Sequence, residues 1–232
     1  MKTVFLGAIG DDALGDTARR FAAKVGVGTE WEVHAGVSTA ASSIVVDERG
    51  DNLICVALGA NERLSREFIR NREKLIGSAK IVVCQLENRL GATEEALMIG
   101  RESGNLTILN PAPINELVTL KLLTLSDIIT PNETEFAFLM KHLFGKQLAP
   151  DYWQLSNPLL HLLCRETQVP TVVITLGDKG CFVSHDPMRR RGDELAYYRL
   201  PPEQVQVLDT TGAGDAFTGG LAAGMILYHY AE

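Results

Sequence analysis

Residues 93–130 read TEEALMIGRESGNLTILNPAPINELVTLKLLTLSDIIT, and their alternating pattern decides the fold. A helix predicted over Thr93–Ser103 leads into an apolar strand over Leu106–Asn110. A short helix around Asn115–Leu123 then leads into a strand over Asp127–Thr130. Strands that are separated by helices pair in parallel, because the chain needs a crossover to return to the same end of the sheet. The stretch therefore predicts an α/β domain.

The same alternation continues in both directions along the chain. The further predicted elements are a helix over Ser65–Ile76, a strand over Ile81–Gln85, helices over Glu133–Phe144 and Tyr152–Thr167, a strand over Thr171–Leu176, a hairpin-like pair over Gly180–Ser184 and Ala196–Leu200, a strand over Gln204–Leu208 and a last helix from about Gly214 to Tyr228. We expect an open, mostly parallel sheet with helices on both faces. Ligands of such sheets bind outside the carboxyl ends of the strands.

The N-terminal part of the chain follows a different pattern. A strand over Val4–Leu6 precedes a helix that Asp11 and Asp12 open and that runs to about Val25. From Trp31 to Leu58 the apolar residues are spaced by two, which predicts antiparallel strands with a hairpin turn at residues 49–51. We expect a small antiparallel β lid over residues 29–60, inserted into a single domain of residues 1–232.

Composition narrows the function. Hydrophobic residues make up 46% and charged residues 22% of the chain, which is typical of a globular protein. The net charge of −7 argues against a nucleic-acid binder, which needs a basic face. No stretch is long and apolar enough for a membrane span, and Thr3–Gly7 is too short for the apolar region of a signal peptide. We therefore expect a cytoplasmic protein that binds neither nucleic acid nor a membrane.

Cysteine and histidine spacing gives no sign of a metal site. None of the four cysteines forms a Cys-x-x-Cys pair, so we expect buried thiols in a reducing compartment. They are Cys55, Cys84, Cys164 and Cys181. The five histidines are scattered and fit surface or packing positions.

The glycine-rich stretch DTTGAGDAFTGGL at residues 209–221 carries the strongest chemical signal. Its glycines let the backbone approach a ligand, and the N–H groups of Gly212, Ala213 and Gly214 at a helix start make an anion site. Such a site can hold a transferring phosphoryl group, and Asp215 can take the proton of an attacking hydroxyl. The alternative is a tight turn in which Asp215 only caps its helix. It is not a Walker A loop, because no Gly-Lys-Ser/Thr follows.

DTTGAGDAF resembles the C-terminal signature of the PfkB carbohydrate kinases. Other segments resemble ribokinases in particular, in the same order and spacing: GAIGDDALG at residues 7–15, QLE at 85–87, NPAP at 110–113, IITPNETE at 128–135 and ITLGDKG at 174–180. The resemblance covers essentially the whole chain. It implies a ribokinase-like fold and ATP-dependent phosphorylation of the primary hydroxyl of a pentose, D-ribose foremost, to give ribose 5-phosphate.

The resemblance also implies roles for single residues in sugar binding and catalysis. Asp215 is the implied catalytic base, and Gly212, Ala213 and Gly214 form the implied anion hole. Glu87 is implied to bind a sugar hydroxyl, with a plain surface-loop glutamate as the alternative. The segment from Trp31 to Leu58 resembles the family's lid, which covers the sugar. The resemblance also implies that the lid often pairs between two subunits. Its alternating apolar residues would leave an exposed face unless they met a partner or the substrate, so we expect a homodimer that pairs through the lid.

Nucleotide and metal sites are implied in the same way. The implied ATP-binding residues are Asn132, Thr175, Leu176, Gly177, Asp178, Lys179, Gly180 and Gly214. The Gly-Asp-Lys-Gly part of this loop also fits a β-turn without any ligand. Asn132 and Glu135 are implied to hold Mg²⁺, partly through water, although the same pair fits a helix capping box. Asp209 and Thr211 are implied to bind K⁺, with a strand-end turn as the alternative for Asp209.

The chain departs from the family at both ends. No Gly-Gly-Lys-Gly-x-Asn segment precedes Val4, and the adenine-covering loop and the rest of the cation site are missing after the last helix. We therefore expect a domain that is incomplete at both ends. Three functions stay open: a pentose kinase, a non-catalytic relative that binds nucleotide weakly or pairs with a full-length subunit, and another PfkB-type kinase acting on a nucleoside or ketohexose.

Overall fold

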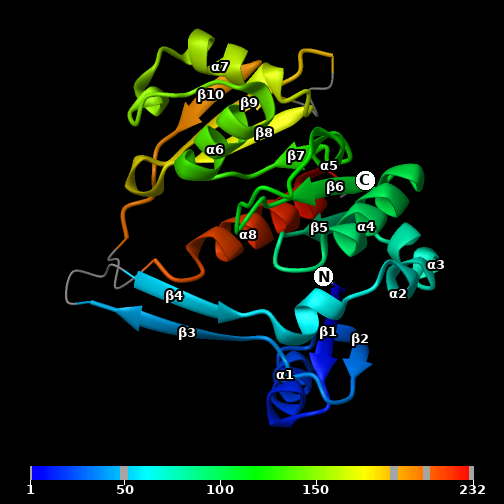
Figure 1. Ribbon diagram of the computed structural model, residues 1–232. Helices are drawn as coiled ribbons and strands as arrows, with labels where there is room; N and C mark the ends of the chain where they lie inside the picture. Colours follow the sequence, from blue (N-terminus) through cyan, green and yellow to red (C-terminus); the bar gives the residue numbers. More distant parts are fainter. Residues whose placement is uncertain (1, 48–51, 189–192, 206–209, 230–232) are drawn as a thin grey trace. The chain divides into compact units, whose positions relative to one another are not determined.

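The computed structural model describes residues 2–47, 52–188, 193–205 and 210–229 (Figure 1). The chain divides into two compact units. The first unit comprises Met1–Leu75, Glu87–Ala96 and Gln206–Glu232, and the second comprises Ile76–Leu86 and Leu97–Val205. The sequence-based expectation of a single domain stays a prediction.

The second unit is built on a six-stranded sheet with the order β10-β9-β8-β7-β6-β5. Its strands are β5 (Ile81–Cys84), β6 (Leu106–Leu109), β7 (Ile128–Ile129), β8 (Thr171–Thr175), β9 (Cys181–His185) and β10 (Tyr197–Leu200). Strands β5 to β8 pair in parallel, whereas β9 and β10 run antiparallel to their neighbours. This mostly parallel sheet, with its helices, confirms the predicted fold class.

The helices of the second unit match the sequence where their ends have local signals. They are α4 (Leu90–Glu102, which starts in the first unit), α5 (Leu120–Thr124), α6 (Glu133–Phe144) and α7 (Asn157–Glu166), with the 3-10 turns η2 (Tyr152–Gln154) and η3 (Gly177–Lys179). Helix α6 has the predicted ends. The helix predicted from Asn115 is shorter, because the Asn115 side chain accepts the Leu117 N–H at 2.9 Å and holds a turn. The segment predicted as one helix from Tyr152 divides into η2 and α7, with Pro158 in the first turn of α7.

The first unit begins with a βαβ arrangement. Strand β1 (Val4–Gly10) continues past Gly7, where the sequence predicts its end, and pairs in parallel with β2 (Gly28–His34). Helix α1 (Ala13–Lys24) connects them, so it forms the crossover that parallel pairing requires. The prediction that Trp31–His34 belongs to an antiparallel set is therefore wrong.

The lid strands of the first unit agree with the prediction. β3 (Ala41–Val46) and β4 (Asn52–Ala57) pair antiparallel and form a long ribbon, drawn blue to cyan in Figure 1. The predicted turn at residues 49–51 lies outside the described residues. Large apolar side chains on both strands are exposed: Ile44, Val45, Val46, Leu53, Ile54 and Val56.

The rest of the first unit consists of helices. They are η1 (Gly59–Arg63), α2 (Arg66–Arg70), α3 (Glu73–Gly77, whose end reaches the second unit) and α8 (Ala213–His229). The single helix predicted over Ser65–Ile76 is wrong, because α2 ends at the turn formed by Asn71 and Arg72. Gln204 and Val205 form no strand, and the rest of that predicted strand lies outside the described residues. None of the helices within the described ranges has both the length and the apolar character needed to cross a bilayer.

The four cysteines are free thiols. Cys164 and Cys181 are buried as expected, and Cys84 is half-buried. Burial raises the pKa of the Cys84 and Cys164 thiols to about 12 in each case. Cys55 lies exposed on β4, so the prediction that it is buried is wrong.

The packing of Phe136 in the core of the second unit allows a prediction about stability. Phe136 of α6 is fully buried and stacks on Tyr152 of η2, with 5.8 Å between ring centroids. Phe136→Ala should lower the free energy of unfolding by about 3–5 kcal/mol, because a cavity replaces a buried ring. Phe138→Ala on the same helix is the control, since Phe138 is only half-buried. Urea unfolding compares the two, and equal losses would contradict the packing described.

Candidate functional site

The glycine turn before α8 is open on its outer side. Gly212 has a φ of +73°, a left-handed conformation that favours glycine. A β-carbon on Gly212 or on Gly214 would meet no atom of the described residues within 4 Å. The backbone of the turn is therefore accessible to an approaching group, as the predicted anion hole requires.

One of the three predicted anion-hole donors is already used within the turn. The Ala213 N–H donates to the Thr210 carbonyl at 3.1 Å, and the Ala216 N–H donates to the Gly212 carbonyl at 2.9 Å, which starts α8. The amides of Gly212 and Gly214 precede that first helical bond, where backbone N–H groups lack partners inside the helix. The anion hole stays a prediction, with these two amides as its better donors.

The first unit brings two predicted site residues together. Asp215 lies exposed in the first turn of α8, and Glu87 lies just before α4. Partial burial of its carboxyl group raises the pKa of Glu87, although the residue as a whole is exposed, and repulsion from the Asp215 carboxylate raises that pKa further. The implied sugar ligand and the implied base therefore belong to the same unit and lie within electrostatic range of each other.

The Asn132–Glu135 pair forms the helix cap that the sequence left open as an alternative. The Asn132 side chain accepts the Glu135 N–H at 2.8 Å, and the Glu135 carboxylate accepts the Asn132 N–H at 2.8 Å. This reciprocal capping box starts α6. Burial raises the pKa of Glu135; the bond from the Asn132 N–H opposes that rise, and Glu133 adds to it.

Their oxygen atoms are of the kind that Mg²⁺ prefers. Oδ1 of Asn132 and Oε2 of Glu135 already accept backbone N–H groups, so a direct metal contact at these atoms would compete with the cap. Binding through water, as the resemblance implies, avoids that competition. The magnesium role of the pair stays a prediction.

The cap and the predicted nucleotide loop are neighbours in the second unit. Asn132 forms a parallel bridge with Thr175, and the Thr175 N–H donates to the Pro131 carbonyl at 2.9 Å. The loop then closes on itself, since the Leu176 N–H donates to the Gly180 carbonyl at 2.8 Å. Parallel β7 and β8 both end here, which is the edge where such sheets bind ligands.

The two glycines of this loop serve different purposes. Gly180 has a φ of +82°, and a β-carbon there would lie 2.0 Å from the Leu200 carbonyl oxygen. The chain at Leu200 therefore requires glycine at this position. This supports the alternative in which Gly180 is part of a turn that needs no ligand. Gly177 has a φ of +55° and open space around it.

The charged residues of the loop are exposed and form a pair. Lys179 Nζ lies 2.6 Å from Asp178 Oδ1, and this hydrogen bond lowers the pKa of Asp178. The same ammonium group lies 5.3 Å from the centroid of the Trp153 ring. Trp153 could not be predicted as a neighbour, because it belongs to η2, which is far from the loop along the chain.

The cation site is only partly covered by the structure. Asp209 lies outside the described residues, and Thr211 is exposed at the turn before α8. Among the side chains that the structure describes, no group of three or more His, Cys, Asp or Glu residues could hold a metal ion. The potassium site stays a prediction.

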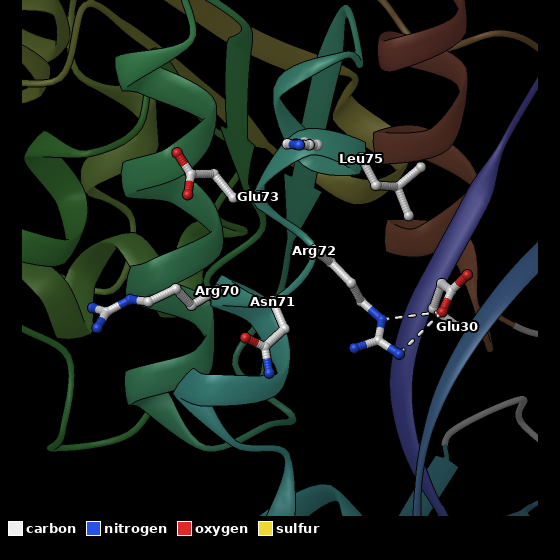
Figure 2. A pocket seen from close by; sticks show the side chains of 7 residues that line it. Glu30, Arg70, Asn71, Arg72, Glu73 and Leu75 are labelled. Carbon is white, nitrogen blue, oxygen red and sulfur yellow. Dashed lines mark hydrogen bonds and ion pairs between the residues drawn. The ribbon is translucent and has the colours of Figure 1, made fainter.

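An open depression in the first unit was not predicted (Figure 2). Glu30 of β2 and the segment from Arg70 to Leu75 line it. Figure 2 shows Arg72 reaching Glu30, with 3.0 Å between Nη2 and Oε2, whereas Arg70 and Glu73 point to the other side. None of the predicted site residues lines this depression, and its charged groups do not converge on one point.

Comparisons with known proteins agree on one family. The family model described as "pfkB family carbohydrate kinase" matches residues 1–228. A ribokinase of Mus musculus is 33% identical over 228 residues, which is 98% of this chain and 67% of that protein. A ribokinase of Haemophilus influenzae is 34% identical over 226 residues, 97% of this chain and 69% of that protein. The chain thus spans about two thirds of the length of these relatives.

Two further comparisons show the structural match and the breadth of the family. The crystal structure of a Thermotoga maritima ribokinase matches with a TM-score of 0.79 at 27% identity, covering 96% of this chain and 67% of that one. A deoxyribokinase of Salmonella typhimurium is 28% identical over 222 residues, 95% of this chain and 68% of that protein.

The capping box predicts how the two readings of Glu135 can be separated. Glu135→Gln keeps an oxygen that can accept the Asn132 N–H, so stability should stay near that of the parent. Glu135→Ala should cost about 1 kcal/mol. If Glu135 also helps to bind Mg²⁺, Glu135→Gln separates this role from capping. Its thermal unfolding should then be unchanged, whereas its nucleotide binding should need several-fold more Mg²⁺. An unchanged Mg²⁺ requirement in Glu135→Gln would show that Glu135 only caps α6.

The two loop glycines give a second test. Gly180→Ala should cost about 2–4 kcal/mol, because it adds a backbone clash to an unfavourable conformation. Gly177→Ala should cost about 1–2 kcal/mol, because it adds the conformational penalty alone. Chemical unfolding of both variants is the measurement. Equal losses would contradict the close approach of Leu200 to Gly180.

Proposed function

Because the chain belongs to the pfkB family of carbohydrate kinases, we propose that it transfers the γ-phosphoryl group of ATP to the primary hydroxyl of a pentose. D-ribose is the proposed sugar, since the relatives from Mus musculus and Haemophilus influenzae, at 33% and 34% identity, are ribokinases. The products are ribose 5-phosphate and ADP. The observation that carries the proposal is the open glycine turn at the start of α8, with Asp215 beside it and the Glu87 carboxyl group close to Asp215.

Asp215 is the proposed base. Its carboxylate takes the proton of the sugar hydroxyl, the hydroxyl oxygen attacks the γ-phosphorus, and the bond from that phosphorus to the bridging oxygen breaks as ADP leaves. The amides of Gly212 and Gly214 lie at the positive end of α8 and are proposed to stabilise the charge that develops on the phosphoryl oxygens. Glu87 accepts a hydrogen bond from another hydroxyl of the sugar and so orients it.

The second unit carries the proposed nucleotide residues. Thr175, Leu176 and the turn from Gly177 to Gly180 follow β8, next to the capped start of α6. Asn132 and Glu135 are proposed to hold Mg²⁺, partly through water. The bound ion would neutralise phosphate charge. Asp209 and Thr211 are proposed to bind K⁺.

The lid supports a proposed homodimer. Its strands expose apolar side chains on both faces, a pattern that natural sheets cover with a substrate or a partner. A second copy of the lid would pair through the same residues, as in a two-fold symmetric interface. The proposed compartment is the cytoplasm.

Two alternatives to this function remain. The deoxyribokinase relative makes 2-deoxyribose a second candidate sugar. A non-catalytic role, in nucleotide binding or in pairing with a longer subunit, is the alternative of a different class. A sugar panel with ATP, with and without K⁺, separates these on the 232-residue chain and on a version extended at both ends.

The base assignment gives the central prediction. Asp215→Asn should lower turnover by about 10²–10⁴-fold, because general-base catalysis contributes that much, while ATP binding changes less than about two-fold. A coupled assay for ADP measures turnover, and titration calorimetry measures nucleotide binding. Asp16→Asn, at an exposed carboxylate of α1, is the control. Near-parental turnover in Asp215→Asn would refute the base. ATP binding without turnover of any sugar in the extended parent would favour the non-catalytic role.

A further inference from the structure

The base of the lid is fastened by one carboxylate. Asp12 is the N-cap of α1, and its Oδ1 accepts the Gly15 N–H at 2.8 Å. The same carboxylate reaches Thr39, two residues before β3: Oδ1 accepts the Thr39 hydroxyl at 2.6 Å and Oδ2 accepts the Thr39 N–H at 2.8 Å. A capping aspartate needs only the first of these bonds. Capping of α1 therefore does not explain the other two bonds, which join Asp12 to Thr39.

Thr39 also forms a hydrogen bond with β1. Its hydroxyl oxygen accepts the Gly10 N–H at 2.9 Å, at the carboxyl end of β1. The segments approach so closely that a β-carbon on Gly10 would lie 2.1 Å from the Val37 carbonyl oxygen. Parallel strands bind their ligands at this end. The start of the lid is thus joined to the edge of the first unit where a substrate is expected.

The other end of the lid is tied to the same point. After β4, the Ala60 N–H donates to the Ser38 carbonyl at 2.9 Å, and Ala60 is fully buried. A β-carbon on Gly59 would lie 2.3 Å from that carbonyl oxygen. Both strands therefore leave the unit through one joint formed by Ser38, Thr39 and Ala60. Among the contacts within the described part of the chain, Thr39 is the residue of this joint that a charged side chain holds.

The charge of Asp12 makes the joint stronger than a neutral contact. The hydrogen bond from the Thr39 side chain is the largest influence that lowers the pKa of Asp12, followed by the bonds from the Gly15 and Thr39 amides. Hydrogen bonds to an ionised carboxylate are roughly twice as strong as neutral ones. The lid strands themselves are exposed, so the joint has a large share in setting their direction.

We propose that Asp12 is a positioning residue for the sugar site: through Thr39 it sets the angle at which the lid leaves the first unit and closes over the substrate. The inference rests on the proposed function, in which the lid covers the sugar. The competing reading is that Asp12 only caps α1.

Asp12→Asn separates the two readings. Asparagine caps helices as well as aspartate does, so α1 keeps its start. Its amide nitrogen, however, would bring a donor against the Thr39 N–H, and one amide oxygen must replace both carboxylate oxygens. Thr39→Val removes the hydroxyl at similar size, and Thr39→Ser restores it. Asp11→Asn is the matched control, because it removes an adjacent exposed charge.

The first measurement is independent of catalysis. One spin label on Cys55 of β4 and one on a cysteine introduced by Lys24→Cys at the end of α1 report the lid angle, in a Cys84→Ser background. Labelled chains are diluted with unlabelled ones, so that the proposed homodimer adds no distances between copies. The parent, Asp11→Asn and Thr39→Ser should then give one narrow distance distribution. Asp12→Asn and Thr39→Val should broaden it, with unchanged helix content by circular dichroism. Narrow distributions in both of these variants would overturn the inference.

The second measurement links the joint to the substrate. Asp12→Asn and Thr39→Val should raise KM for the sugar by about 3–10-fold, the loss of one hydrogen bond, with KM for ATP and kcat within about two-fold. Thr39→Ser should return to the parental value. Broadened distances with an unchanged sugar KM would overturn the positioning role. If the parent turns over no sugar while Asp12→Asn and Thr39→Val still broaden the distances, the proposed function is refuted and the role of the joint is still supported.

Discussion

The buried pairing of β6 with β7 is the constraint on which the second unit depends. All four residues of β6 are fully buried, and one of them, Thr107, is polar. Its hydroxyl donates to the Leu125 carbonyl at 2.9 Å, and the Asp127 carboxylate accepts the Thr107 N–H at 2.9 Å. A buried hydroxyl left without partners would destabilise the strand. These bonds fix the register of β7, whose end leads directly to the cap at Asn132.

Local signals explain what the sequence could predict. Helix α6 has the expected ends because Asn132 and Glu135 cap its start and Gly145, in a left-handed conformation, ends it. The parallel β strands were also predictable, since each apolar run follows a helical one. The partner of a strand is a different matter. Trp31–His34 has the alternation of an antiparallel strand, and only the crossover through α1 makes its pairing parallel.

In the candidate site, too, some features could be predicted from the sequence and others could not. Residues that the family pattern identifies, such as Glu87 and Asp215, lie close to each other in the first unit. The pattern could not tell which glycine meets a ligand, because Gly180 is required by the passing chain at Leu200. It also missed the contact of Asp12 with Thr39, since nothing in GAIGDDALG indicates a partner in another segment. Long-range contacts of this kind leave no local trace in a sequence.

The capping box has a consequence for ion affinity. Any cation that took Oδ1 of Asn132 or Oε2 of Glu135 directly would have to exchange an existing hydrogen bond for a coordination bond. The net binding free energy would be the difference between the two, so the capping box would weaken any cation site that uses these two atoms directly. A weak site releases its occupant quickly. That suits an ion that travels with a nucleotide, arriving and departing once in every cycle, better than one that stays permanently.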